Sequence, residues 1–315
     1  MFSLAYFGTT MKLFFIILLV VTFNAHGVPN KSKSQEFKNT KLPAEKGDAK
    51  AQSDLAFMYA KGEGVLKNEG EKVRWFRKSA DQGYADAQYE LGVMYDKGKG
   101  VIKDPEEALI WYRKAANQGY LGAQYNLALM FDKGEGVLIS PEEAFKWYRI
   151  VAEEGVAGAQ NKLAEMYDNG YGGSINPEKS VIWYRKSADQ GHVGAQFKLA
   201  VMYNVGRGVE KDLEEAVKWY RKAADQGHAS AQLGLGLMYR FGDGVLKNPK
   251  EAVIWYRKAA DQGNAKAQSS LADAYCYGIG ISKDSKNCSS WAKKANDGGY
   301  DTSKLWNDFE LWKYQ

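Results

Sequence analysis

The stretch YADAQYELGVMYDKGKGVIKDPEEALIWYRKAANQG, residues 84–119, decides the fold of this chain. In its first half, small and apolar residues recur at helical spacing; they are Ala87, Leu91, Gly92, Met94 and Tyr95. The sequence Gly98-Lys99-Gly100 follows them, and glycine favours a turn because it adopts left-handed backbone conformations at little cost. The pattern predicts a first helix, helix A, that ends at these glycines.

The second half of the stretch begins with a signal for the start of a helix. Asp104 is a suitable N-cap, Pro105 takes the first helical position and Glu107 the third. An apolar stripe with helical spacing follows, formed by Ala108, Trp111, Tyr112, Ala115 and Ala116. Gly119 then stands where a helix commonly stops. We predict a second helix, helix B, and therefore a helical hairpin.

This hairpin recurs along the chain. Seven tryptophans stand 36 residues apart: Trp75, Trp111, Trp147, Trp183, Trp219, Trp255 and Trp291. A glutamine precedes each of them by 23 residues: Gln52, Gln88, Gln124, Gln160, Gln196, Gln232 and Gln268. Tandem units of this size form arrays in which each unit packs on its neighbours. We predict an all-α fold, a right-handed α/α superhelical solenoid of seven 36-residue helical hairpins with terminal caps, with the tryptophans as structural core.

Charge argues against a nucleic-acid-binding protein. The 43 basic and 38 acidic residues give a net charge of +5, and both signs alternate within every repeat. Acidic residues gather at the starts of the predicted B helices and basic residues at their ends, as in Arg113-Lys114, which the helix dipole favours. We interpret the basic residues of helix B as a solvated face and expect no nucleic-acid partner.

The beginning of the chain resembles a secretory signal peptide. An apolar run from Leu13 to Phe23 is followed by Asn24-Ala25-His26-Gly27, with small residues at positions minus three and minus one of a cut after Gly27. The run is shorter than the roughly 20 residues of a membrane-spanning helix. We expect residues 1–27 to be a signal peptide, with Met11 as an alternative start, and no stable membrane span in the mature chain.

Cys276 and Cys288 are the two cysteines of the chain, and both fall in the last repeat. In an oxidising compartment such a pair favours a disulfide, and two free buried thiols are the alternative. Cys276 lies at the end of the predicted helix A, and Cys288 replaces a small alanine early in helix B. We expect a disulfide that bridges the hairpin.

The repeated unit reads Ala-Gln-x-x-Leu-(Gly/Ala)-x-Met-Tyr, then Gly-x-Gly-Val, then Ala-x-x-Trp-Tyr-Arg-Lys-Ala-Ala-x-Gln-Gly. This pattern resembles the Sel-one-like repeat (SLR) family over residues 48–299, in seven copies. Tetratricopeptide repeats are the nearest alternative, but their period is about 34 residues, and their helix connection is shorter than the 16 residues from Gly92 to Ala108. The resemblance implies a protein-interaction scaffold in which helix A lines the inner side, where partner proteins or peptides dock.

Three positions of helix A are predicted to share one face, namely one, five and eight residues after the repeated glutamine. The candidate partner-binding residues at these positions are Tyr89, Val93, Asp96, Tyr125, Leu129, Asp132, Asp168, Phe197, Val201, Asn204, Leu237 and Arg240. At the first two positions, burial between repeats is the alternative. In the fourth copy these two positions are polar, Asn161 and Glu165. Charges at the third position should reach solvent, so we expect an acidic surface in the first half of the array.

The ends of the array depart from the pattern. We expect residues 28–47 to form a polar linker and a partial N-terminal repeat, with Val28 to about Thr40 disordered. Residues 300–315 are predicted to form a C-terminal capping helix through apolar residues at roughly helical spacing, Leu305, Trp306, Phe309, Leu311 and Trp312.

An enzyme is the weaker hypothesis, and we expect no catalytic residue, metal site or cofactor. His192 and His228 stand at a turn position that holds tyrosine or asparagine in other repeats. Ser290-Trp291-Ala292-Lys293 matches the Ser-x-x-Lys motif of penicillin-binding proteins and β-lactamases, but Ser-Asp-Asn and Lys-Thr-Gly are both missing from the sequence. A weak β-lactamase-like or cell-wall-directed hydrolase is the alternative function.

We therefore predict a monomeric scaffold that is exported from the cytoplasm and binds a partner protein or peptide. The resemblance implies two settings, the bacterial envelope with host-interaction processes, and the lumen of the eukaryotic secretory pathway. We expect the first, in a secreted or periplasmic protein.

Overall fold

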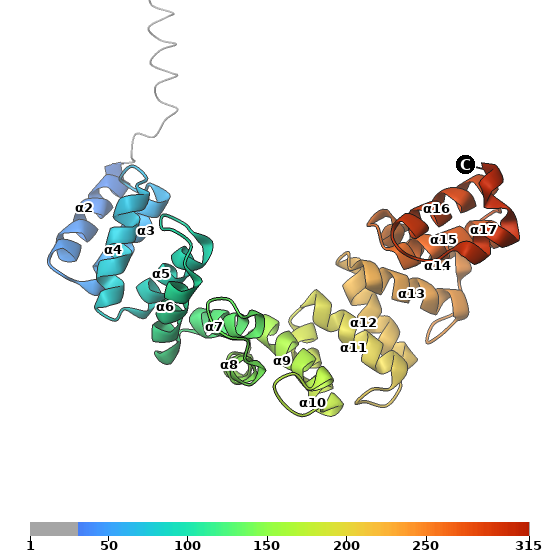
Figure 1. Ribbon diagram of the computed structural model, residues 1–315, viewed down its shortest axis with the longest axis horizontal. Coiled ribbons are helices and arrows are strands. Elements are labelled where there is room, and N and C mark those ends of the chain that lie inside the picture. Colours follow the sequence, from blue (N-terminus) through green and yellow to red (C-terminus); the bar gives the residue numbers. More distant parts are fainter. Residues whose placement is uncertain (1–30, 315) are drawn as a thin grey trace, which may run out of the picture. The chain divides into compact units, whose positions relative to one another are not determined.

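The computed structural model describes residues 31–314, so the expected signal peptide at residues 1–27 lies outside the described part of the chain. Within residues 31–314 the chain forms sixteen α-helices and one 3-10 helix, and no strand (Figure 1). The predicted all-α solenoid of helical hairpins is confirmed.

Fourteen helices of 13 residues each form the seven hairpins, with helix A before helix B in every repeat. They are α3 (Ala49–Lys61), α4 (Glu69–Asp81), α5 (Ala85–Lys97), α6 (Pro105–Asn117), α7 (Leu121–Lys133), α8 (Pro141–Glu153), α9 (Ala157–Asn169), α10 (Pro177–Asp189), α11 (Val193–Val205), α12 (Leu213–Asp225), α13 (Ala229–Phe241), α14 (Pro249–Asp261), α15 (Ala265–Tyr277) and α16 (Ser285–Asp297). The helix α2 (Lys31–Glu45) precedes them, and α17 (Ser303–Phe309) and the 3-10 helix η1 (Leu311–Tyr314) follow.

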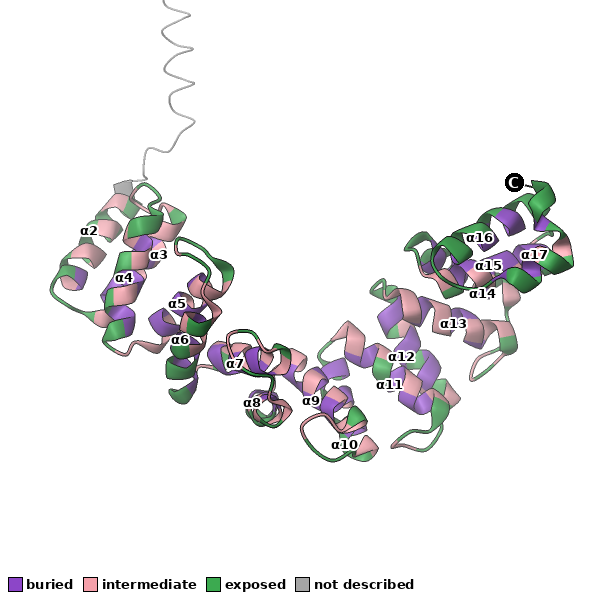
Figure 2. Cartoon of the chain, in the orientation of Figure 1, coloured by how far each residue is buried: buried purple, intermediate pink, exposed green. Residues whose placement is uncertain are grey.

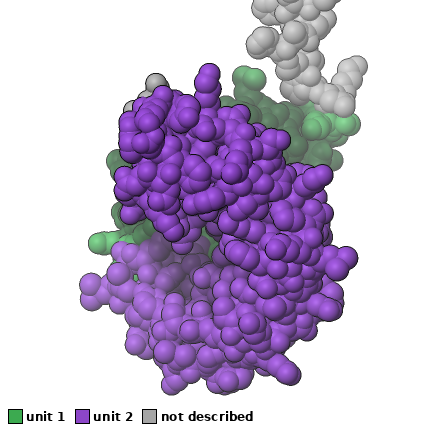
Figure 3. Space-filling model, turned by 90° about the vertical axis from the view of Figure 1, so that its right-hand side faces the viewer, with its two compact units in different colours: residues 1–126, 135–137 green, residues 127–134, 138–315 purple. Residues whose placement is uncertain are grey.

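The chain divides into two compact units, coloured in Figure 3. Unit 1 contains the chain up to Asn126 and residues Glu135–Val137, and unit 2 contains residues Leu127–Gly134 and the chain from Leu138 onward. In unit 1, α2, α3, α4, α5 and α6 pack in chain order, each on the next. The same nearest-neighbour packing runs in unit 2 from α8 to α17.

Local signals fix the helix boundaries. Each of the seven B helices begins after an Asn, Asp or Ser residue. The side chain of this N-cap residue accepts a hydrogen bond from a backbone N–H of the first turn. The caps are Asn68, Asp104, Ser140, Asn176, Asp212, Asn248 and Asp284. Helix A ends at a left-handed glycine, such as Gly98 with φ 67°. In six of the seven turns the second glycine lets a neighbouring backbone come close; a Cβ at Gly172, for example, would lie 2.2 Å from the backbone oxygen of Pro141.

The core repeats with the same period. The leucine three residues after each glutamine is fully buried, from Leu55 to Leu271, and buried residues recur on every hairpin (Figure 2). The tyrosine after the tryptophan packs beneath helix A, where small residues leave room for it. A Cβ at Gly92 would lie 2.6 Å from the ring of Tyr112. Burying side chains of this size stabilises each hairpin by roughly 1.5 to 3 kcal/mol per residue.

The repeated glutamines form a series of hydrogen bonds that we call the glutamine ladder. Each of the seven donates from Nε2 to the backbone oxygen eight residues earlier, at the end of the preceding helix, over 3.0 to 3.1 Å. Five of them also accept at Oε1 from a second glutamine 30 residues later, over 2.7 to 2.8 Å. The other two glutamines, Gln124 and Gln268, lack this second glutamine. The residue 30 positions later is Glu154 in the first case and Gly298 in the second. The buried Oε1 atoms of Gln124 and Gln268 have no hydrogen-bond partner.

Both ends differ in detail from the sequence-based expectation. Disorder was expected up to about Thr40, but from Lys31 onward the segment is helical. The ring of Phe37 contacts the ring of Tyr59 at 5.6 Å, and the oxygen of buried Ala44 accepts from Gln52, so α2 packs on α3 as a helix B packs on the next helix A. At the other end, left-handed Glu310 separates α17 from η1, so two short helices take the place of the single predicted helix.

The predicted disulfide is confirmed. Cys276 on α15 is bonded to Cys288 on α16, with 5.3 Å between the Cα atoms. Both residues are buried, so the bond joins the two helices of the last hairpin inside the core of unit 2.

Candidate functional site

The twelve candidate partner-binding residues are all partly exposed. We call them the helix A row; in unit 1 it contains Tyr89, Val93, Asp96 and Tyr125, and in unit 2 Leu129, Asp132, Asp168, Phe197, Val201, Asn204, Leu237 and Arg240. Part of each residue's surface is therefore accessible to solvent.

The aromatic residues of the first position also link neighbouring repeats. The ring of Tyr89 stacks on that of Tyr120 at 4.8 Å, and the ring of Phe197 stacks on that of His228 at 4.7 Å. At the second position, Val201 and Leu237 pack against the buried core of unit 2. These residues pack between repeats and remain partly exposed, so partner binding at these positions stays a prediction.

The charged residues of the third position are paired. Asp96 lies 2.9 Å from Lys97, Asp168 lies 2.7 Å from Arg207, and Arg240 lies 3.6 Å from Asp273. Asp132 has the longest ion pair of this set, 3.9 Å to Lys162. Because neighbouring bases neutralise most of these carboxylates, the surface is less acidic than the sequence alone indicates.

Buried tyrosine hydroxyls lie beneath the row. The hydroxyl of Tyr184 has no hydrogen-bond partner, whereas that of Tyr148 donates to Asp132 over 3.4 Å. Burial raises the pKa of Tyr256 and of the equivalent Tyr220 to about 12. These groups stay protonated at neutral pH.

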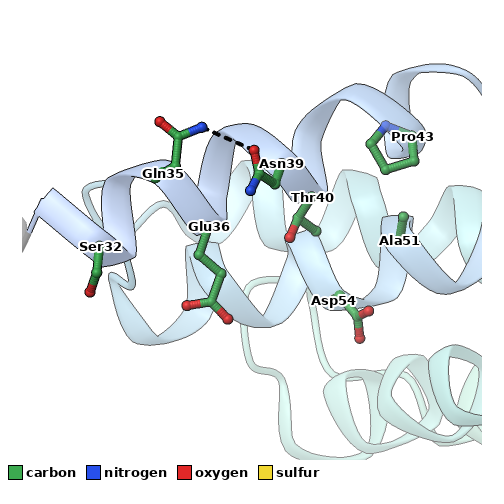
Figure 4. Close-up of a pocket in the computed structure, with 8 residues that line it drawn as sticks. All are labelled: Ser32, Gln35, Glu36, Asn39, Thr40, Pro43, Ala51 and Asp54. Atoms are coloured by element: carbon green, nitrogen blue, oxygen red, sulfur yellow. Dashed lines mark hydrogen bonds between the residues drawn. The ribbon is translucent and has the colours of Figure 1, made fainter.

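A cavity of about 260 Å³ opens beside the row in unit 2. We call it the α9 cavity; it is lined by Asp132, Tyr148, Lys162, Glu165, Met166, Asn169 and Tyr171. A larger groove of about 540 Å³ lies in unit 1, between α2 and α3 (Figure 4). Six of its lining residues lie along α2, and Ala51 and Asp54 lie on α3, so it is separate from the helix A row.

The tryptophans lie between the repeats and are covered by basic side chains. Trp75, Trp111, Trp219, Trp255 and Trp291 are buried, whereas Trp147 and Trp183 are partly exposed. In six repeats a lysine three residues later lies over the ring, 3.8 to 4.6 Å from its centroid; these are Lys78, Lys114, Lys186, Lys222, Lys258 and Lys294. These lysines are nevertheless exposed, which agrees with the solvated basic face expected from the sequence.

Sequence reasoning missed a role of the arginines of helix B. Four arginines of helix B donate to the hydroxyl of a tyrosine 18 residues later, on the next helix A: Arg77 to Tyr95, Arg185 to Tyr203, Arg221 to Tyr239, and Arg257 to Tyr275. The constant spacing of 18 residues was visible in the sequence and could have revealed the link. These arginines therefore connect neighbouring repeats.

The side chains singled out for chemistry have structural roles or are exposed. Nδ1 of His192 and of His228 accepts from the backbone N–H three residues later, so both histidines are helix caps. Ser290 and Lys293 are exposed on α16. In residues 31–314, no cluster of three His, Cys, Asp or Glu side chains could hold a metal ion. No helix in this range has the length and apolar character that crossing a membrane requires.

Known structures share this architecture. A protective antigen present in uropathogenic Escherichia coli strains, which displays an SLR fold, is 36% identical with a TM-score of 0.78, and the match covers 86% of this chain and 59% of the antigen. A Sel1 repeat protein from Oxalobacter formigenes is 32% identical with a TM-score of 0.68, covering 87% of this chain and 80% of that protein. This chain thus spans little more than half the length of the E. coli antigen. No curated protein matches it.

The Sel1 repeat matches seven successive segments, residues 49–84, 85–120, 122–156, 157–192, 193–228, 229–264 and 265–300. These segments correspond to the seven helical hairpins and include the buried leucines and the glutamine ladder. The chain belongs to the Sel1 repeat family.

Proposed function

We propose that this chain is an exported scaffold that binds a partner protein or peptide along the helix A row. One observation carries the proposal. The buried Leu and Gln of helix A are the same in all seven repeats, whereas the partly exposed row beside them changes from aromatic and aliphatic to charged. Variable chemistry on a constant backbone is what an interaction surface of a repeat protein needs, because each repeat then contributes a different contact.

The apolar part of the row in unit 2 supports a protein partner. Phe197, Val201 and Leu237 are partly exposed, and at the ends of the same helices Val205 is 59% and Phe241 60% exposed. Apolar and aromatic side chains that remain open to solvent on one helix face are common in protein interfaces.

Family membership agrees with this function, since Sel1 repeat proteins are in general protein-interaction scaffolds. The similar E. coli protein is described as a protective antigen. Together with the disulfide, which persists in oxidising compartments, this supports a secreted or periplasmic location in a bacterium. Mass spectrometry of the native protein tests export, because a mature chain that begins at Val28 is expected and an intact residue 1–27 segment would contradict it.

Site-specific photo-crosslinking in the cells that make the protein tests the surface. A photoreactive phenylalanine analogue is placed at Val205 or Phe241, at the ends of α11 and α13. Matched controls are Ile182 and Ile254, which are 54% and 49% exposed on the B helices α10 and α14. We expect the two helix A positions to capture the same protein and the two helix B positions to capture none of it. Capture from helix B alone would move the interface away from the row.

No observation favours the hydrolase. Ser290 and Lys293 line neither the α9 cavity nor the α2–α3 groove. A nitrocefin assay with the variant Ser290→Ala checks this alternative directly, and hydrolysis that the substitution abolishes would revive it.

A further inference from the structure

The α9 cavity lies where the fourth repeat departs from its neighbours. Glu165 stands at the second position of the helix A row, where the next two repeats have Val201 and Leu237. Two carboxylates, those of Asp132 and Glu165, border the cavity together with one ammonium group, that of Lys162. The lining therefore carries a formal charge of minus one, and its volume of about 260 Å³ has room for several water molecules or for a polar side chain.

One repeat further along, the chain fills the equivalent place with its own arginine. Arg207 reaches back 39 residues to Asp168, where its Nε donates to Oδ1 and its Nη2 donates to the backbone oxygen, both over 2.7 Å. This is a charge-assisted pair of hydrogen bonds from one planar guanidinium group to two acceptors of one residue. The framework of the repeat thus holds a guanidinium at this point without any change of backbone.

In the α9 cavity the same acceptors lack a guanidinium. Asp132 is the equivalent of Asp168, and Tyr171 replaces Arg207. The hydroxyl of Tyr171 approaches the backbone oxygen of Asp132 only to 3.5 Å, and the carboxylate of Asp132 receives the Tyr148 hydroxyl at 3.4 Å. Both contacts are long, so the acceptors of Asp132 are bonded more weakly than those of Asp168.

Lys162 does not take the place of the missing arginine. Its Nζ lies 3.9 Å from Asp132 and 3.4 Å from Glu165, and its side chain is 36% exposed. The contact with Asp132 is long and only partly buried, so it contributes little, and the ammonium group can turn away from Asp132 at small cost. Glu165 is held in place on its other oxygen by the amide of Asn161, over 3.0 Å.

We propose that the α9 cavity binds the guanidinium of an arginine side chain from the partner protein, in the way that Arg207 occupies the equivalent place on Asp168. This inference rests on the proposed function, because it names one residue that the partner presents to the helix A row. Arginine fits better than lysine, since a planar fork of donors matches a carboxylate and a neighbouring carbonyl oxygen, whereas an ammonium group is a compact point charge. Met166 and the ring of Tyr171 offer apolar surface to the methylene groups of the incoming side chain.

Methyl NMR on the purified protein tests the proposal without knowledge of the partner. Met166 lines the cavity, and Met202 is its equivalent beside the Asp168–Arg207 pair, so methionine methyl labelling gives a signal and a matched control in one sample. The probes are three capped tripeptides, Ala-Arg-Ala, Ala-Lys-Ala and Ala-citrulline-Ala. They are added up to about 10 mM, because a single side chain is expected to bind no tighter than millimolar.

We expect the arginine peptide to shift the Met166 methyl signal with saturation, the citrulline peptide to leave it unchanged, and Met202 to stay in place. Asp132→Asn should weaken binding at least tenfold, and Asp168→Asn should not. Tyr171→Arg should block the site by filling it from within. Arg207→Tyr should open a second site, so that the arginine peptide then also shifts Met202. The remaining methionine signals report whether each variant is folded.

The assignment would be overturned if the Met166 methyl signal did not shift, or if it shifted equally with the arginine and the citrulline peptide. An equal shift with the lysine peptide would also overturn it, because the cavity would then be a general cation site. The two proposals fail separately. If crosslinking captures a partner on helix A while Met166 does not respond to arginine, only the cavity assignment falls. If Met166 responds while no partner is captured, the scaffold falls and the arginine site stands.

Discussion

The glutamine ladder predicts that two chemically identical substitutions in unit 1 have different costs. Gln88 donates to Ala80 over 3.1 Å and accepts from Gln118 over 2.8 Å. Gln124 makes the same donor contact, to Ala116 over 3.1 Å, but its buried Oε1 has no partner. Leucine is close to glutamine in size and removes the amide at both positions.

The expected magnitudes follow from counting hydrogen bonds. Gln88→Leu removes two, each worth about 0.5 to 1.5 kcal/mol, so the free energy of unfolding should fall by about 2 kcal/mol. Gln124→Leu removes one and at the same time relieves a buried oxygen without a partner, a gain of about 1 to 3 kcal/mol. The net effect of Gln124→Leu should therefore lie between no change and a gain of about 1 kcal/mol. Ala80 and Ala116 keep a hydrogen bond from Gly83 and Gly119 in either case, so no new orphan acceptor arises.

Urea unfolding followed by circular dichroism measures the difference, with native-state hydrogen exchange of α5 and α7 as a local readout. We expect Gln88→Leu to lower the midpoint clearly and Gln124→Leu to leave it unchanged or raise it slightly. If both variants lost the same free energy of unfolding, the hydrogen bonds of the glutamine ladder would contribute nothing beyond side-chain packing. That result would refute the reasoning.

Three further outcomes can be checked by standard means. Trp219→Ala should cost about 3 to 5 kcal/mol in urea unfolding, because this tryptophan is buried between repeats; an unchanged midpoint would contradict the packing. The free energy of unfolding should fall as the pH rises from about 10, the usual tyrosine pKa, towards 12, because Tyr256 keeps its proton in the folded state while the unfolded chain loses it. Tyr256→Phe should flatten this part of the pH profile. An unaltered slope would count against burial as the cause. Reduction of the bond between Cys276 and Cys288, 12 residues apart, should destabilise the last hairpin by roughly 3 kcal/mol; hydrogen exchange in α15 and α16 that is insensitive to reductant would disprove this.

The sequence predicted what depends on local chemistry. Asp104, Pro105 and Gly98 mark helix boundaries that the structure has, because caps and left-handed glycines act within a few residues of the backbone that they order. Cys276 and Cys288 could be paired because the repeat pattern placed them on the two helices of one hairpin.

The sequence could not predict contacts that depend on side-chain reach. Arg207 pairs with Asp168 across 39 residues, and nothing in the residues near Asp168 shows that its charge is neutralised. A partial repeat was expected before α3, but the helical start of α2, from Lys31 to about Thr40, was expected to be disordered for a related reason. Its composition is polar, and the contacts of Phe37 with Tyr59 and of Ala44 with Gln52 become visible only once α3 is in place.

The central claim is that the face bearing the helix A row, and not that of helix B, binds the partner. The most direct measurement is the affinity of the captured partner for two double variants by isothermal titration calorimetry. We predict that Val205→Asp with Phe241→Asp weakens binding at least tenfold, about 1.4 kcal/mol, while Ile182→Asp with Ile254→Asp leaves it unchanged and both proteins keep their helical circular dichroism. Lost affinity in the helix B variant with unchanged affinity in the helix A variant would contradict the account.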